Sequence, residues 1–225
     1  MGLSGKRVLI TCAGQYMGPA IRQLFEAEGA QVVASENPLL DQAGVTAVMA
    51  EAGAVDILIA NFAEPPRSAA VDQIQDDDWL VLFDTLVHPL MRIVRAVTPQ
   101  MKERQAGKIV AVTSAAPLRG IPYNTAYCAA RGAQNAFIRA AGLELARFNI
   151  HVNAIAQNYV KNNTYYPKTL FQNEKFLQNV NQLVPTRRVA EGSETAELAL
   201  FLASDRCSHL VGQIIPMAGG WVTST

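Results

Sequence analysis

The chain has 225 residues, of which half are hydrophobic and 17% are charged. This composition excludes a disordered, collagen-like or coiled-coil protein, and the length is sufficient for one domain with a sizeable core. Lys plus Arg and Asp plus Glu number 19 each, so there is no basic excess to hold a phosphate backbone. We therefore expect no nucleic-acid partner.

The chemically distinctive residues are few and scattered. Cys12, Cys128 and Cys207 form neither a disulfide framework nor a zinc-binding set, which fits a reducing compartment. The three histidines are too far apart in the sequence for a short metal-binding motif. Lys6 and Arg7 interrupt what a signal peptide would need as an apolar run, and no run is long enough for a membrane span. We expect a soluble cytoplasmic protein with no metal and no membrane contact.

Short apolar runs alternate with longer helical patterns along the chain. The apolar runs predict strands over 7–12, 31–35, 55–61, 108–113, 151–156 and 213–217. The helical patterns predict helices over 18–28, 39–52, 76–104 with a break near His88-Pro89, 124–147 and 193–203, and leave 157–190 as a loop with short helices. Wholly apolar strands that alternate with helices indicate a parallel sheet covered on both faces. We expect an α/β fold: a single doubly wound, Rossmann-like domain over residues 1–225, with six or seven parallel strands.

The turn after the first predicted strand departs from the glycine-rich pattern that binds dinucleotides. Such a turn needs glycines so that it can be tight and its backbone can approach a pyrophosphate. This turn reads TCAGQYMG and keeps only Gly14 and Gly18, with Gln15 and Tyr16 between them. One interpretation is that the Tyr16 ring blocks a nucleotide site. The other is that the ring swings outward and the variant turn still binds NAD(P).

The region after the second strand bears on the same question. Glu36 could hold a ribose or be a solvated loop residue. Only residues 36–54 separate the second and third predicted strands, which leaves space for one helix but not for an extra strand. We therefore expect the adenine side of any nucleotide site to be shortened.

Three polar residues can converge at one edge of the predicted sheet. Ser114 follows a strand at the carboxyl edge, where open α/β sheets place their ligands. Tyr127 and Arg131 are four residues apart on a predicted helix, so they share a face. A nearby guanidinium favours a phenolate and lowers a tyrosine pKa from its usual ~10, while Arg does not release its own proton. The alternative is that Tyr127 packs at a helix start and Arg131 is a surface charge.

With these residues in place, the chain resembles the short-chain dehydrogenase/reductase superfamily over nearly its whole length. Within it, the chain resembles the halohydrin dehalogenases, which share T-x4-[F/Y]-x-G in place of the glycine loop and a Ser-Tyr-Arg triad. The matching residues are Thr11, Tyr16, Gly18, Ser114, Tyr127 and Arg131. Either motif alone would be weak, but the combination is specific.

The resemblance implies a lyase-type reaction that needs no cofactor. A vicinal haloalcohol is converted to an epoxide, a halide and a proton, and small anions open epoxides in reverse. Tyr127 is then the general base, Arg131 lowers its pKa, and Ser114 orients the substrate oxygen. No nicotinamide and no metal are required.

The resemblance also implies a pocket in which backbone N–H groups face the halide. The residues expected around the halide and the substrate are Thr11, Tyr16, Phe62, Gln157, Asn158, Tyr159 and Val160. Some family members have Pro in place of Gln157. Phe62, together with Tyr165, Tyr166 and Trp221, is a candidate for an apolar substrate wall, or these residues belong to the ordinary core. The partners implied are a small haloalcohol or epoxide, a halide or other small anion, and three further copies of the chain in a homotetramer (a dimer of dimers) built on the two long helices.

Two other functions remain open from the sequence. The first is an NAD(P)-dependent short-chain oxidoreductase with Arg131 where the dehydrogenases have Lys; nucleotide binding would distinguish it. The second is a non-catalytic binding protein on the same scaffold, which would show no turnover with either class of substrate.

Overall fold

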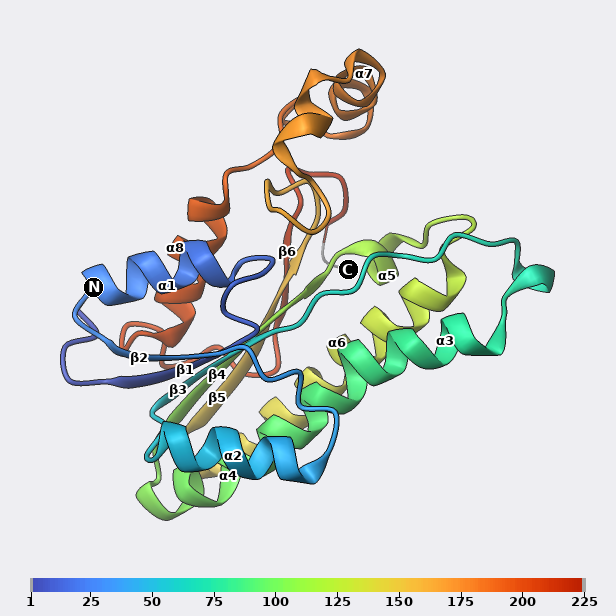
Figure 1. Ribbon diagram of the computed structural model, residues 1–225. Coiled ribbons are helices and arrows are strands. Elements are labelled where there is room, and N and C mark those ends of the chain that lie inside the picture. The colour runs from blue at the N-terminus through green and yellow to red at the C-terminus, as the bar shows by residue number, and fades with distance from the viewer. Residues whose placement is uncertain (1, 224–225) are drawn as a thin grey trace.

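The computed structural model describes residues 2–223, and within them six parallel strands form one sheet (Figure 1). The strands are β1 (Arg7–Thr11), β2 (Gln31–Ser35), β3 (Ile57–Asn61), β4 (Gly107–Ser114), β5 (Ile150–Gln157) and β6 (Ile214–Met217). Their order across the sheet is β2-β1-β3-β4-β5-β6. The predicted Rossmann-like α/β fold is confirmed, with six strands in the described residues.

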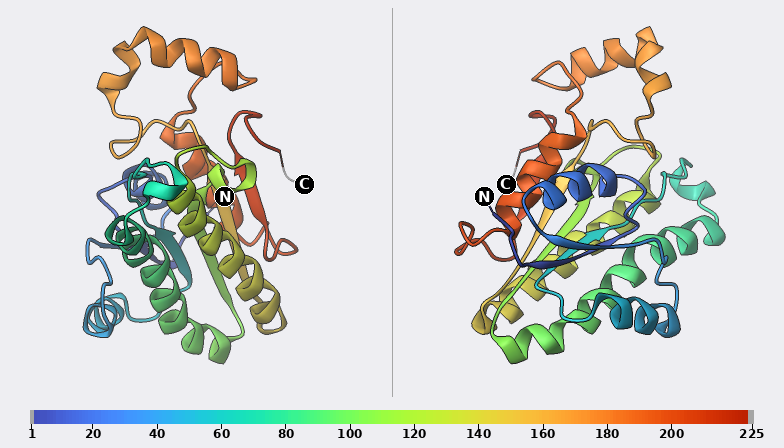
Figure 2. Two further views of the ribbon diagram at one scale, coloured as in Figure 1. Left: turned by 90° about the vertical axis from the view of Figure 1, so that its right-hand side faces the viewer. Right: turned by 60° about the vertical axis from the view of Figure 1, so that its left-hand side comes forward.

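Helices cover both faces of the sheet (Figures 1 and 2). The α-helices are α1 (Gly18–Ala27), α2 (Gln42–Ala52), α3 (Asp76–Leu82), α4 (His88–Arg104), α5 (Ala116–Arg119), α6 (Thr125–Leu145), α7 (Glu174–Leu183) and α8 (Gly192–Ala203). Shorter helical turns are η1 (Val71–Gln73), η2 (Phe83–Val87), η3 (Ala146–Phe148) and η4 (Lys168–Gln172). α1 and α8 pack together on one face, and α2, α4 and α6 cover the other.

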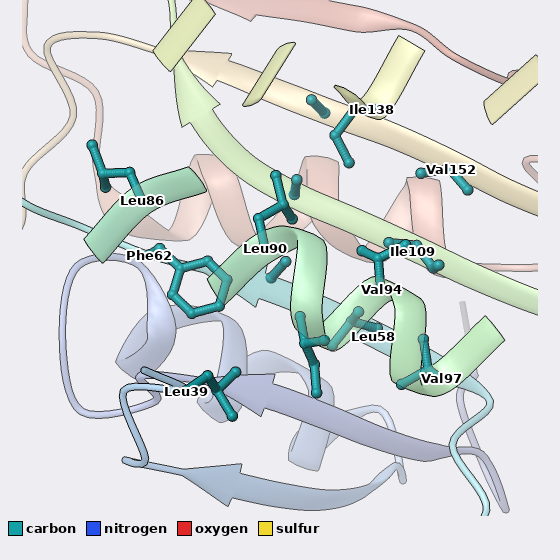
Figure 3. Close-up of a cluster of buried hydrophobic side chains, with 14 of the residues drawn as sticks. Leu39, Leu58, Phe62, Leu86, Leu90, Val94, Val97, Ile109, Ile138 and Val152 are labelled. Atoms are coloured by element: carbon teal, nitrogen blue, oxygen red, sulfur yellow. The ribbon is translucent and has the colours of Figure 1, made fainter. Parts of the chain in front are cut away.

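The strands are apolar throughout because both of their faces are buried. All five residues of β3 are buried, as are seven of the eight residues of β4. On the face covered by α2, α4 and α6, Phe62, Leu86 and Leu90 belong to one hydrophobic cluster (Figure 3). Ile21 and Phe25 of α1 belong to a second cluster on the opposite face. Burial on both sides explains why the strands lack the alternation of a half-exposed sheet.

The predicted helix over 76–104 does not break at His88-Pro89. The chain remains helical from α3 through α4, and the five-residue turn η2 between them is a π-helix. Pro89 lies in the first turn of α4, where its missing N–H costs little. The wider turn of the π-helix connects α3 to α4 without interrupting the helix.

The helix predicted over 39–52 begins later, at Gln42. The Asp41 side chain caps it by accepting a hydrogen bond from the Gly44 N–H at 2.8 Å. Leu39 lies before the cap with a φ of +57°, and its side chain is buried in the cluster of Figure 3. Leu39 therefore follows the hydrophobic pattern without being helical.

The expectation of a shortened adenine side is confirmed by the sheet order. β2 is the edge strand, and the chain passes through α2 directly to β3 on the other side of β1. The direction of winding reverses between β1 and β3, which is where open α/β sheets bind ligands at the carboxyl ends of their strands.

The segment over 157–190 contains more helix than its sequence suggests. η4 and α7 project beyond the carboxyl edge of the sheet (Figures 1 and 2). Val180, Val184 and Val189 form a small hydrophobic cluster there, separate from the main core. In residues 2–223 no helix has the length and apolar character needed to cross a bilayer.

Candidate active site

A cavity of about 360 Å³ lies at the carboxyl edge of the sheet. Seven of the residues that the sequence singled out line it: Tyr16, Ser114, Tyr127, Gln157, Asn158, Tyr159 and Val160. Tyr165, Tyr166 and Trp221, the candidates for an apolar wall, line it as well. The volume is within the range of ~300–1,000 Å³ that is usual for small-molecule sites.

Ser114 ends β4 at the floor of this cavity. Its side chain is almost completely buried, and its Oγ accepts a hydrogen bond from the Ala116 N–H at 3.1 Å. That bond holds the hydroxyl at the start of α5. In residues 2–223 the Ser114 hydroxyl donates to no protein acceptor, so its proton is available to a ligand.

Arg131 is fully buried, and it donates to two tyrosine hydroxyls and two carbonyl oxygens, none of which is a carboxylate. Its Nε donates to the Tyr127 hydroxyl oxygen at 3.1 Å, and its Nη2 donates to the Tyr165 hydroxyl oxygen at 2.7 Å. Its Nη1 donates to the Phe62 carbonyl at 3.1 Å and to Gln134 Oε1 at 2.8 Å. No carboxylate of the described residues forms an ion pair with it. A buried cation without a counterion favours negative charge on an adjacent phenol.

The two tyrosines that neighbour Tyr127 in this cluster have their protons committed to the backbone. The Tyr16 hydroxyl donates to the Thr113 carbonyl at 3.0 Å. The Tyr165 hydroxyl donates to the Glu64 carbonyl at 2.8 Å and accepts from the Glu64 N–H at 3.0 Å. In contrast, the Tyr127 hydroxyl accepts from the guanidinium, and it donates to no backbone carbonyl of the described residues.

Burial keeps the two neighbouring tyrosines protonated. It raises the pKa of both Tyr16 and Tyr165, although the charge of Arg131 opposes the rise. Burial acts to lower the pKa of Arg131, but the surrounding tyrosine oxygens, Tyr127 first, raise it above its usual value. The cluster therefore holds a permanent cation and two phenols that burial keeps neutral, beside Tyr127, which lines the cavity.

The loop between β1 and α1 is tied down by protein groups. Asn61 at the end of β3 accepts from the Met17 N–H at 3.2 Å and donates to the carbonyls of Cys12 and Gln15 at 2.9 and 3.0 Å. Gly18 opens α1 so close to the loop that a Cβ there would collide with the Ala13 carbonyl. Gly18 is thus needed for the shape of the loop.

Glu36 and Tyr16 occupy the parts of this loop that a dinucleotide would approach. The Glu36 carboxylate accepts from the Gly14 N–H at 2.5 Å. Tyr16 has a φ of +53°, a left-handed conformation that favours glycine and typically costs ~1–3 kcal/mol for other residues. Its ring is buried at the cavity and lies 5.2 Å from the Tyr165 ring, centroid to centroid, in an edge-to-face arrangement. The ring points inward, as the blocked interpretation of the sequence requires.

The segment after β5 offers fewer backbone donors than the resemblance implies. The Asn158 N–H donates to the Met217 carbonyl at 3.1 Å, and the Tyr159 N–H donates to the Asn158 side-chain oxygen at 3.0 Å. That side-chain oxygen also accepts from the Tyr166 hydroxyl at 2.7 Å. The Val160 N–H has no acceptor among the described residues. Val160 therefore supplies the free peptide donor of this segment.

The chain was compared with known proteins. The family model described as enoyl-(acyl carrier protein) reductase matches residues 5–222. The chain belongs to the short-chain dehydrogenase/reductase superfamily. Among curated proteins it is similar to the 3-oxoacyl-[acyl-carrier-protein] reductase FabG of Thermotoga maritima, with 29% identity over 99% of this chain and 100% of that protein.

Two solved structures of superfamily members named for dehalogenation are also similar to this chain. A structure described as "Dehalogenation enzyme" has a TM-score of 0.91 and 30% identity, covering 99% of this chain and 100% of the other. Halohydrin dehalogenase HheC bound to ethyl (2S)-oxiran-2-ylacetate has a TM-score of 0.86 and 27% identity, covering 97% and 98%.

The superfamily fold implies a nicotinamide dinucleotide at the β1–α1 loop, and the residues here do not fit one. A pyrophosphate needs backbone N–H groups and the positive end of α1. The Gly14 N–H already faces the Glu36 carboxylate, which would repel a phosphate. The Tyr16 side chain fills the turn, and Asn61 and the loop's own carbonyls take other N–H groups.

Two residues expected at the pocket lie away from it. Thr11 is fully buried between β1 and β3, where its hydroxyl accepts from the Asn61 N–H at 2.9 Å. The Phe62 side chain is buried in the cluster with Leu86 and Leu90 (Figure 3), and only its carbonyl serves the site, through Arg131. The side chains of both residues pack between secondary-structure elements and do not enter the cavity.

Two residues that the sequence did not identify as partners of Arg131 hold its guanidinium in place. Gln134, one turn beyond Arg131 on α6, accepts from the guanidinium and donates to the Leu86 carbonyl in the π turn at 2.6 Å. Tyr165 was expected only as an apolar wall, and its hydroxyl bonds were not foreseen. The i, i+3 spacing of Arg131 and Gln134 could have indicated the first contact.

Proposed function

We propose that this protein is a cofactor-independent halohydrin dehalogenase. It converts vicinal haloalcohols into an epoxide, a halide and a proton, and in reverse it opens epoxides with small anions. The arrangement of Ser114, Tyr127 and Arg131 around one cavity supports the proposal. The similarity to HheC and to the second dehalogenation enzyme supports it as well.

The observation that carries the proposal is the position of Tyr16. A Ser-Tyr-Arg cluster alone is compatible with hydride transfer, because a reductase also needs a tyrosine acid. Hydride transfer requires the nicotinamide beside that tyrosine. The pyrophosphate of the dinucleotide must then bind at the β1–α1 loop. Here the buried Tyr16 ring lines the cavity, and its hydroxyl donates a hydrogen bond to the Thr113 carbonyl near the end of β4. The ring therefore occupies space that a dinucleotide would need.

The chemistry follows from the hydrogen bonds of the cluster. Ser114 donates its free proton to the substrate hydroxyl oxygen and orients it. Tyr127, as a phenolate stabilised by Arg131, takes the substrate proton. The resulting alkoxide forms a bond to the neighbouring carbon, the carbon–halogen bond breaks, and the halide leaves with the electron pair. Tyr127 then releases the proton to solvent, since Arg131 cannot relay it.

The leaving halide needs a donor and an apolar wall with no nearby carboxylate. The unpartnered Val160 N–H meets the first need. Tyr159 and Tyr166 line the cavity beside it and supply aromatic surface, and no carboxylate side chain lines the cavity in the described residues. We place the halide next to the Val160 N–H for these reasons.

The reaction can be tested by measuring halide and proton release from a vicinal bromoalcohol in weakly buffered solution. We expect release by the wild-type protein and its loss in Tyr127→Phe and in Arg131→Lys, because Lys cannot donate to all four acceptors of the guanidinium. Tyr123→Phe is the matched control, since Tyr123 is exposed and outside the cluster. Release that persists in Tyr127→Phe would refute the assigned base.

An NAD(P)-dependent oxidoreductase is the second candidate, and the similarity to FabG favours it. It differs in requiring a nucleotide. Saturable binding of NADPH or NADH at micromolar concentration, with oxidation of the nucleotide on addition of a ketone, would replace the dehalogenase proposal by this one. We expect neither nucleotide binding nor nucleotide oxidation, because Tyr16 and Glu36 occupy the β1–α1 loop.

We further propose that the protein assembles as a homotetramer through α4 and α6. The outer faces of these two helices form an apolar hollow of about 490 Å³ that includes Met91, Val94 and Phe137. Covering such a surface with a second copy would bury its apolar area. Light scattering during size-exclusion chromatography checks the mass, and a monomer of 24.3 kDa would refute the assembly.

A further inference from the structure

The cavity beside Tyr127 carries one formal charge. Arg119, the last residue of α5, is the only charged side chain among the described residues that line it. Ring closure of a haloalcohol does not need this guanidinium, because Tyr127 and Arg131 already handle the proton. The charge of Arg119 is therefore available to another group of the substrate.

Arg119 is held in a defined orientation at the cavity. Its Nη1 donates to the Trp221 carbonyl at 3.1 Å, and its guanidinium carbon lies 4.8 Å from the centre of the Trp221 ring. An arginine has five N–H donors, so this contact leaves most of them free. No carboxylate in residues 2–223 forms an ion pair with Arg119. A guanidinium that is stacked and oriented in this way can form two parallel hydrogen bonds to a carboxylate.

The field of Arg119 reaches the wall of the cavity. Burial raises the pKa of Tyr159, and the charge of Arg119 opposes that rise. Tyr159 lines the cavity next to Val160. An anionic group that enters the cavity thus meets a positive potential on this side, and no carboxylate side chain of the described lining opposes it.

The cavity is also larger than the reacting atoms require. A three-carbon haloalcohol has only five heavy atoms, whereas the cavity of about 360 Å³ is comparable with sites for drug-sized ligands, ~300–1,000 Å³. The additional space lies in a cavity whose wall includes both Trp221 and Arg119. A substrate that extends from Tyr127 toward Arg119 would use it.

We propose that the preferred substrates are haloalcohols and epoxides that bear a carboxylate, which Arg119 binds. This inference rests on the proposed dehalogenase function and specifies its substrate class. The reaction is unchanged: the carbon–oxygen bond forms, the carbon–halogen bond breaks, the halide takes the electron pair, and Tyr127 takes the proton. The carboxylate remains ionised throughout and only positions the substrate.

The test compares 4-chloro-3-hydroxybutanoate with its ethyl ester, which share the reacting carbons and differ in charge. Halide release is measured for both with the wild-type protein, Arg119→Gln and Arg119→Lys, against blanks without protein. We expect the wild-type protein to favour the acid by about tenfold in kcat/KM, as a charge-assisted bidentate contact would give. In Arg119→Gln the preference should fall close to unity, and Arg119→Lys should be intermediate.

The outcomes are distinct. An Arg119→Gln variant that loses activity equally on acid and ester would mean that Arg119 only supports Trp221, and would overturn the proposal. A wild-type preference for the ester would also overturn it. If neither substrate releases halide while 1,3-dibromo-2-propanol does, the substrate class is wrong and the dehalogenase function stands. If none of the three releases halide, the function fails and this inference fails with it.

Discussion

The two sides of the carboxyl edge of the sheet differ in whether their polar groups are satisfied. On the β1–α1 side, the N–H groups of Ala13, Gly14, Gln15, Met17 and Gly18 all donate to protein acceptors. On the cavity side, the hydroxyl proton of Ser114 and the N–H of Val160 have no acceptor within residues 2–223, and Tyr127 donates to no backbone carbonyl there. Buried polar groups are normally satisfied, so unsatisfied ones that face a cavity indicate where a ligand supplies the partner.

Under the proposed function, the same architecture serves a different reaction through this difference in hydrogen bonding. The positive end of α1 remains, but Glu36 and Asn61 have replaced an external anion as partners of the loop. The free donors lie instead around Tyr127 and Val160, where an oxygen and a halide of the substrate would sit. The fold alone does not reveal this change, which depends on a few side chains.

Tyr127→Phe should have the largest effect, because it removes the oxygen that is proposed to take the substrate proton. We expect halide release to fall by at least ~10²-fold, the lower range for loss of a general base. The ring remains, so the melting temperature should change little. A smaller loss of kcat, with the Tyr123→Phe control normal, would mean that another group takes the proton.

Tyr165→Phe should have the next largest effect, through Arg131. The hydroxyl of Tyr165 bonds both the guanidinium and the backbone of Glu64, so its removal leaves an N–H of a buried cation without a partner. Such a loss costs about 1–3 kcal/mol, and we expect kcat to fall about tenfold with KM nearly unchanged. A raised KM with normal kcat would show that Tyr165 only contacts the substrate.

Alkaline pH should weaken the folded protein through its buried phenols. Burial raises the pKa of Tyr16, Tyr165 and Tyr166 in the folded state above the unfolded value of ~10. Each therefore contributes stability that is fully present below about pH 10 and is lost as the pH rises toward the folded pKa. Urea midpoints between pH 8 and 11.5 check this, and Tyr16→Phe should flatten the decline. An unchanged midpoint across that range would contradict it.

Glu36→Gln should have the smallest effect. The carboxylate is exposed, and the amide can still accept from the Gly14 N–H, so we expect less than about 1 kcal/mol of lost stability and normal halide release. NADPH should still fail to bind, because Tyr16 remains in the loop. Tight NADPH binding by this variant would show that Glu36 alone excludes the nucleotide from the β1–α1 loop.

The sequence was sufficient for the six strands, for most of the helices that cover them, and for the meeting of Ser114, Tyr127 and Arg131 at one cavity. Continuous apolar runs locate strands such as β3 because both faces are buried, and the i, i+4 spacing places Tyr127 and Arg131 together on α6. The sequence did not reveal Tyr165 as a partner of Arg131, because the two residues are 34 positions apart and meet through a loop. The resemblance placed Phe62 at the pocket, with the ordinary core as the alternative, and its ring packs in the core (Figure 3).

The most direct test of the account is halide release by protein freed of nucleotides with activated charcoal, measured with and without added NADPH and NADH. The account predicts the same rate in every case, with one proton and one epoxide formed per halide and no change in nucleotide absorbance. Release that requires the nucleotide, or no release together with nucleotide oxidation in the presence of a ketone, would contradict it.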